Sequence, residues 1–156
     1  LPPVEGLIFL CGWACLSPGT VFTAFLPWYL YLLGVVWQSA HIMAHYVLNI
    51  RLDDKGNAVA STPLFLSRPS PRTVSLMTLG LTVLLFIMSG LLPVLTTLSW
   101  LYIVPVAAFG LYTVYRCLSF LKESLDINQA HHAWSSLAIY RLVISAAIIA
   151  SILVYH

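Results

Sequence analysis

Residues 73–92 read TVSLMTLGLTVLLFIMSGLL, a run of 20 residues without one ionisable side chain. A helix of about 20 apolar residues is long enough to cross the hydrocarbon core of a bilayer. Pro93 follows the run directly and is expected to end it. The stretch therefore predicts a transmembrane helix.

The composition of the whole chain supports the same class of protein. Its 156 residues are 60% hydrophobic and only 8% charged, whereas ordinary soluble domains carry about 25% charged residues. The net charge of +2 is too small to indicate a nucleic-acid partner. The three cysteines form no CxxC or Cys/His metal pattern, so they indicate neither a zinc site nor a disulfide framework. We expect an integral membrane protein.

Apolar segments follow one another along a single membrane domain, residues 1–156. Their approximate bounds are 4–16, 21–48, 73–92, 97–121 and 133–155. The first is short for a bilayer, and the second is long enough to span with tilt. The connection 49–72 is polar and longer than usual, and long loops are often functional. The expected fold is all-α, a polytopic membrane bundle of about five transmembrane helices.

The distribution of charge predicts the topology. With five spans, the N-terminus, the 49–72 loop and the 122–131 loop lie on one side. Six of the seven Lys and Arg residues fall on that side: Arg51, Lys55, Arg68, Arg72, Arg116 and Lys122. The opposite connections carry no Lys or Arg. The positive-inside rule therefore places the long loop in the cytoplasm or in a mitochondrial matrix.

A polar segment ends the second apolar stretch, Trp37-Gln38-Ser39-Ala40-His41-Ile42-Met43-Ala44-His45. Gln38, His41 and His45 are three to four residues apart, so they share one helical face. Together with Trp37 they are candidate cavity-lining residues. His41 and His45 could instead bind a metal or heme, but no HExxH glutamate and no third ligand are visible. The pattern favours polar helix packing or cavity lining.

Acidic and basic residues follow this helix. Asp53 and Asp54 are candidates for holding Mg²⁺ against a diphosphate. The basic residues that could meet the remaining phosphate charge are Arg51, Lys55, Arg68 and Arg72. The alternative is a solvated loop with a turn at residues 54–57, and the spacing alone favours that alternative.

Arg141 lies about eight residues into the last apolar segment. An intramembrane arginine is a functional hypothesis by default. It could also extend toward the charged side of the membrane or pair with a partner subunit. His131 and His132 precede the segment and are expected at the membrane interface, as is Trp134.

The motif Trp37-Gln38-x-x-His41-x-x-Ala44, followed by Arg51-Leu52-Asp53, resembles heme O synthase (protoheme IX farnesyltransferase), a UbiA-type intramembrane prenyltransferase. That family shows Trp-Gln-x-Pro-His-Phe near the end of its sixth helix and then Arg-x-Asp-Tyr. Pro93-Val94-Leu95 with Trp100 and Pro105 resembles the region of the seventh and eighth helices. The resemblance aligns the whole chain with helices five to nine, the C-terminal half of the family.

The chain departs from the family at several positions. Ala40, Ile42 and Asp54 stand where the family has Pro, Phe and Tyr. The family's first Asp-rich motif, which binds Mg²⁺ and the prenyl diphosphate, has no counterpart in residues 1–156. The resemblance implies that His41 and Asp53 are catalytic, with Mg²⁺ and heme as cofactors, only if another chain supplies the missing half.

The first hypothesis is a non-catalytic membrane subunit derived from such a half, because polar residues on a cavity-facing side need protein partners in lipid. The resemblance implies the mitochondrial inner membrane, the 49–72 loop in the matrix, and cytochrome c oxidase as the neighbour. Other membrane subunits and the bilayer are the expected partners.

One alternative is the C-terminal half of a split heme O synthase that transfers a farnesyl group to heme B. Another is a small heme- or quinone-binding membrane protein that uses His41 or His45.

Overall fold

The computed structural model describes residues 2–20, 22–53, 70–96, 98 and 100–155. Within these ranges, only the backbone is described at residues 2, 3, 5, 18, 49–53, 152 and 155. The described residues form five α-helices and one 3-10 turn, and they contain no strand. The elements are α1 (Pro2–Leu16), η1 (Pro18–Thr20), α2 (Phe25–Asp53), α3 (Pro71–Leu95), α4 (Trp100–Lys122) and α5 (Ile127–Tyr155). The predicted all-α helical bundle is confirmed.

Helices α2, α3 and α5 extend beyond the bounds that the apolar pattern predicts. α3 continues past Pro93 to Leu95, so the expectation that Pro93 ends this helix was wrong. α2 continues to Asp53, so residues 49–53 belong to a helix and not to the 49–72 loop. α5 begins at Ile127, six residues before the expected start at residue 133. Asp126 explains this early start, because its side-chain oxygen accepts a hydrogen bond from the backbone N–H of Asn128 at 2.9 Å. This is an N-cap, which fixes a helix start through a polar residue that hydrophobic periodicity does not detect.

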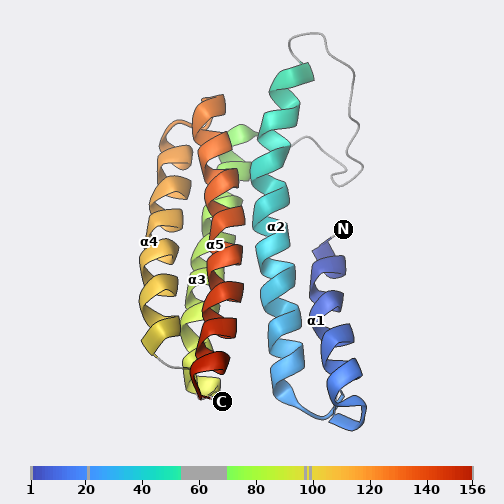
Figure 1. Ribbon diagram of the computed structural model, residues 1–156. Coiled ribbons are helices and arrows are strands. Elements are labelled where there is room, and N and C mark those ends of the chain that lie inside the picture. Colours follow the sequence, from blue (N-terminus) through green and yellow to red (C-terminus); the bar gives the residue numbers. More distant parts are fainter. Residues whose placement is uncertain (1, 21, 54–69, 97, 99, 156) are drawn as a thin grey trace.

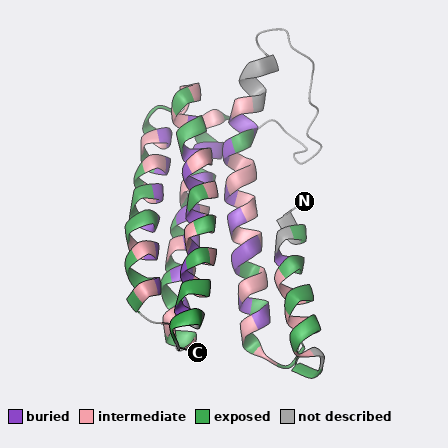
Figure 2. Cartoon of the chain, in the orientation of Figure 1, coloured by how far each residue is buried: buried purple, intermediate pink, exposed green. Residues whose placement is uncertain are grey.

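Consecutive helices run in opposite directions (Figure 1). α2 packs against α3 and α5, and α4 packs against α3 and α5, so these four helices form a closed bundle. α1 lies outside this bundle and packs along α2. Buried residues are concentrated on the faces that the four bundle helices turn toward one another, whereas α1 is mostly exposed (Figure 2).

α1 covers only part of α2. Its 15 residues span about 22 Å, whereas the 29 residues of α2 span about 43 Å. The two helices cross closely at a pair of glycines, where a Cβ on Gly34 would lie 3.2 Å from the Cα of Gly6. Small residues permit this approach of two backbones. The N-terminal end of α1 therefore lies beside the middle of α2 (Figure 1).

Among the described residues, three helical segments are long and apolar enough to cross a membrane: Pro71–Leu95, Trp100–Lys122 and Ile127–Ser151. The outward faces of α3, α4 and α5 carry large exposed apolar side chains, among them Leu84, Ile87, Val104, Leu111 and Leu142. A bilayer is the solvent in which such faces are stable. α2 is not among the three segments because its C-terminal half carries the polar residues that begin at Gln38.

A group of tyrosines joins four helices at one turn of α3. Pro93 has no N–H, so the carbonyl of Ser89 loses its normal helical donor. The hydroxyl of Tyr102 on α4 replaces that donor at 2.8 Å. The hydroxyls of Ser89 and Tyr140 on α5 lie 2.5 Å apart, and the Tyr29 hydroxyl on α2 donates to the Met88 carbonyl at 2.6 Å. We call Tyr29, Tyr102, Tyr140, Met88 and Ser89 the tyrosine network.

Candidate functional site

The candidate site lies where the polar face of α2 meets α5. Trp37, His41 and His45 follow one another at intervals of four residues on α2, which places them on one side of the helix. On α5, Trp134 and Arg141 are separated by two helical turns and share a side in the same way. α2 and α5 pack against each other, and the ring contacts described below join these two faces.

Trp37 links α2 to α5 at the inner end of the site. Its ring is buried, and its indole N–H donates a hydrogen bond to the Leu137 carbonyl on α5 at 2.8 Å. The imidazole of His41 stacks on the Trp37 ring, with 4.9 Å between centroids. The guanidinium carbon of Arg141 lies 4.4 Å from the centroid of the same ring, within the range of a cation–π interaction. Trp37 thus holds one group from each helix.

Trp134 continues the stack toward the end of the bundle at which α5 begins. Its ring centroid lies 5.1 Å from that of His41, 6.0 Å from that of His45 and 5.8 Å from that of His131. The indole N–H of Trp134 is buried, and no acceptor for it is present in the described part of the chain. We call Arg141, Trp37, His41, Trp134, His45 and His131 the histidine–tryptophan column.

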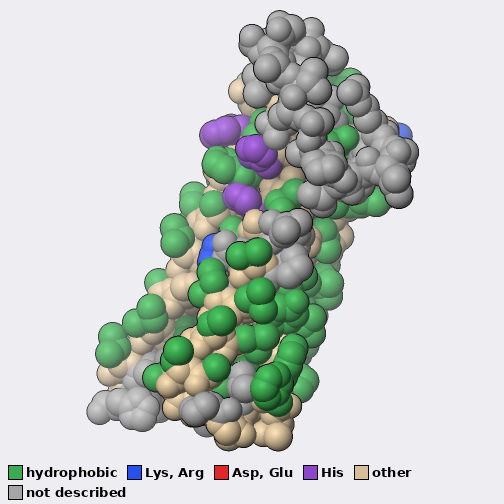
Figure 3. Space-filling model, turned by 90° about the vertical axis from the view of Figure 1, so that its right-hand side faces the viewer, with side chains coloured by type: hydrophobic (Ala, Val, Ile, Leu, Met, Phe, Trp, Pro, Cys, Tyr) green, Lys and Arg blue, Asp and Glu red, His purple; other side chains and the backbone are tan. Residues whose placement is uncertain are grey.

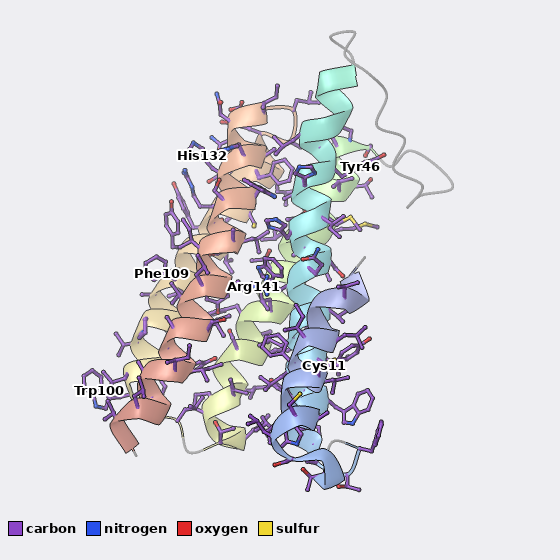
Figure 4. All side chains as sticks on the ribbon, turned by 45° about the vertical axis from the view of Figure 1, so that its right-hand side comes forward. Cys11, Tyr46, Trp100, Phe109, His132 and Arg141 are labelled. Carbon is purple, nitrogen blue, oxygen red and sulfur yellow. The ribbon has the colours of Figure 1, made fainter. Side chains whose placement is uncertain are left out.

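The column has a protected end and an exposed end. His45 and His131 are exposed, His41 and Arg141 are half-buried, and Trp37 is buried. Figure 3 shows histidine side chains gathered in the upper part of one face, with a basic group below them and hydrophobic side chains below that. In Figure 4, Arg141 lies between the helices at about mid-height, far below His132. Because α5 begins at Ile127, Arg141 lies near the middle of the apolar segment Ile127–Ser151. It is therefore farther from the start of this helix than the sequence predicted.

A small pocket adjoins Trp37 and Arg141. It is lined by Phe9, Leu33, Gly34, Trp37, Leu85, Arg141, Ile144 and Ser145. Its volume of ≈ 30 Å³ is enough for a water molecule. Pockets that bind cofactors or small molecules measure about 300–1,000 Å³. This part of the site therefore has no room for a heme or a prenyl chain.

The other predicted site residues lie apart from the column. Gln38 is half-buried on α2, next to Trp37. Arg72 is exposed in the first turn of α3. Arg51 and Asp53 fall in the last turn of α2, where only the backbone is described. Asp54, Lys55 and Arg68 lie outside the described residues, so the predicted Mg²⁺ pair and most of the predicted phosphate cluster remain predictions.

The structure adds Trp134 and His131 to the site, whereas the sequence had suggested an interfacial role for both. Positions 131, 134, 138 and 141 share one face of a helix. This face could have been recognised from the sequence only if α5 had been predicted to begin before His131. Across the described ranges, no three His, Cys, Asp or Glu residues lie close enough together to hold a metal ion. The arrangement is suited to aromatic packing and to hydrogen bonding by imidazoles.

Comparison of the chain with models of known protein families, with curated proteins and with solved structures gave no match. The resemblance to heme O synthase thus stays a prediction that rests on the motifs around Trp37, His41 and Asp53.

Proposed function

We propose that this chain is a non-catalytic integral-membrane subunit that docks against another membrane protein through the histidine–tryptophan column. The observation that carries the proposal is that two of the predicted cavity-lining residues pack against a neighbouring helix of the same chain. Trp37 and His41 pack against α5, and the pocket that Trp37 lines has a volume of ≈ 30 Å³. A prenyltransferase needs a cavity that holds both a prenyl chain and its acceptor, so this geometry supports a subunit without chemistry of its own.

The exposed end of the column supports docking. His45 and His131 present imidazoles on the surface at the end of the bundle that α1 does not reach. Polar side chains in or near a bilayer are stabilised by hydrogen bonds to other proteins or to the interface. The partner we propose is a membrane helix of a second subunit that presents hydrogen-bonding side chains to these imidazoles.

The finer parts of the proposal come from the family resemblance alone. It suggests the mitochondrial inner membrane, a matrix position for the 49–72 loop, and a respiratory assembly with cytochrome c oxidase as the neighbour. These placements are proposals about where the subunit works, and the docking face can be tested without them.

Site-specific photo-crosslinking in the native membrane tests the docking face. A photoreactive amino acid replaces His45 or His131 in two variants of the full chain, and Leu111, which is exposed on α4, in a control variant. We expect the same integral-membrane protein to be crosslinked from positions 45 and 131 and not from position 111. Mass spectrometry identifies the adduct.

Two outcomes would overturn the proposal. The chain could purify alone with no adduct at positions 45 and 131, or its only companion could be the complementary half of a prenyltransferase. In the second case, heme O formation by the reconstituted pair, and its loss in His41→Ala, would establish the split synthase. A Soret band in the spectrum of the purified chain would support the heme-binding alternative instead.

A further inference from the structure

A second, larger pocket lies between α3 and α4, on helices that take no part in the histidine–tryptophan column. It is lined by Arg72, Leu76, Leu121, Lys122 and Ser124, and its volume is ≈ 540 Å³. Arg72 belongs to the first turn of α3, and Lys122 is the last residue of α4. Because the two helices are antiparallel neighbours, these residues meet at the same end of the bundle.

The polar lining of this pocket is basic. Arg72 and Lys122 are both exposed, and Ser124, in the turn that follows α4, adds a hydroxyl to the lining. The acidic residues that follow Lys122 most closely in the sequence form hydrogen bonds with residues of α5. Glu123 accepts a hydrogen bond from the Gln129 amide at 3.4 Å, and Asp126 caps the first turn of α5. Among the described residues that line the pocket, two carry a positive charge and none is a carboxylate.

The rest of the lining is apolar. Leu76 lies one turn below Arg72 and is 58% exposed, and Leu121 precedes Lys122 on α4. Further along α3, Val83, Leu84, Ile87 and Leu91 continue an exposed apolar surface. A ligand for this pocket must carry a negative group at one end and a hydrocarbon chain at the other.

We propose that this pocket binds an anionic membrane phospholipid. Its phosphate contacts the Arg72 guanidinium and the Lys122 ammonium, and an acyl chain runs past Leu76 and Leu121 along α3. The guanidinium of arginine and the ammonium of lysine are the side-chain groups best suited to a phosphate. Basic pockets between transmembrane helices, on the side of the membrane where Lys and Arg are concentrated, bind acidic lipid headgroups. The inference is independent of the docking face, which involves α2 and α5.

Native mass spectrometry of the full chain in detergent tests the proposal. The protein is titrated with phosphatidylglycerol and, separately, with phosphatidylcholine of the same acyl chains. We expect phosphatidylglycerol to bind more tightly. Arg72→Gln and Lys122→Gln should each weaken its binding about fivefold, whereas Arg72→Lys and Lys122→Arg should retain most of the affinity.

Arg116→Gln is the matched control, because Arg116 lies on α4 but contacts the Tyr112 ring and does not line the pocket. Equal binding of the two lipids by the unaltered chain would overturn the proposal, as would an equal loss in Arg116→Gln. Displacement of the lipid by millimolar inorganic phosphate would assign the pocket to a free anion and would also overturn it. Retention of phosphatidylglycerol under that challenge supports the lipid.

Discussion

The tyrosine network and the histidine–tryptophan column are two polar groupings in one apolar bundle. They differ in how far their side chains are buried and in whether their buried polar atoms have hydrogen-bond partners. In the network, each of the three tyrosine hydroxyls has a hydrogen-bond partner, and all three side chains are buried. In the column, His45 and His131 are exposed, and the buried N–H of Trp134 has no acceptor within the described ranges.

The difference indicates what each grouping does. A closed set of neutral hydrogen bonds satisfies backbone and side-chain groups that lipid cannot satisfy, so it stabilises the fold. The imidazoles at the outer end of the column are exposed at the surface, so we expect them to contribute more to assembly than to folding. Changes in the network should therefore affect the free energy of unfolding, and changes at the exposed end of the column should affect assembly.

The largest effect is expected for Tyr140→Ala. The ring is fully buried, so its removal leaves a cavity and takes away the hydroxyl partner of Ser89. We expect the free energy of unfolding to fall by about 3 kcal/mol or more, as measured by denaturant titration of the protein in detergent. Leu142→Ala, at a position that is 68% exposed on the same helix, is the control and should change little. Equal effects would show that the network has no special role.

Tyr102→Phe should destabilise the protein by about 1–2 kcal/mol, because it leaves the Ser89 carbonyl without a donor. Pro93→Ala restores the N–H that the helix lacks at this position. In a Pro93→Ala background, the same Tyr102→Phe change should therefore cost less. A double-mutant cycle measures this coupling, and strict additivity would contradict the pairing of Pro93 with Tyr102.

Trp37→Phe tests the protected end of the column. The change keeps an aromatic ring between His41 and Arg141 but removes the N–H that bonds to Leu137. We expect a loss of about 1 kcal/mol in the free energy of unfolding. Trp37→Leu also removes the cation–π interaction with Arg141 and should cost more. If the two variants were equally stable, the ring contacts would contribute nothing.

The smallest effect on folding is expected for His45→Ala, at the exposed end of the column. Its free energy of unfolding should stay within about 0.5 kcal/mol of the original value. The amount of the chain that migrates in a larger complex on native gels should nevertheless fall. Unchanged complex formation would remove His45 from the docking face, and a large loss of stability would place it with the closed network instead.

Much of the fold and part of the site can be predicted from local sequence. The uncharged run 73–92 predicts a membrane helix, and α3 contains it. The spacing of Trp37, His41 and His45 predicts a shared face, and all three take part in one stack. The start of α5 was missed because the Asp126 cap precedes a polar turn, and with it the contributions of His131 and Trp134 were missed.

The sequence by itself determined the class of the protein, its helical segments and the polar face of α2, because these follow from hydropathy and from the period of a helix. Only the tertiary structure decided that this face packs on Trp134 and Arg141 and leaves ≈ 30 Å³ beside Trp37. It likewise decided that Tyr102 replaces the donor that Pro93 removes. Such contacts join residues distant in the chain, and they depend on how each helix is rotated and offset against its neighbours, which no local pattern specifies.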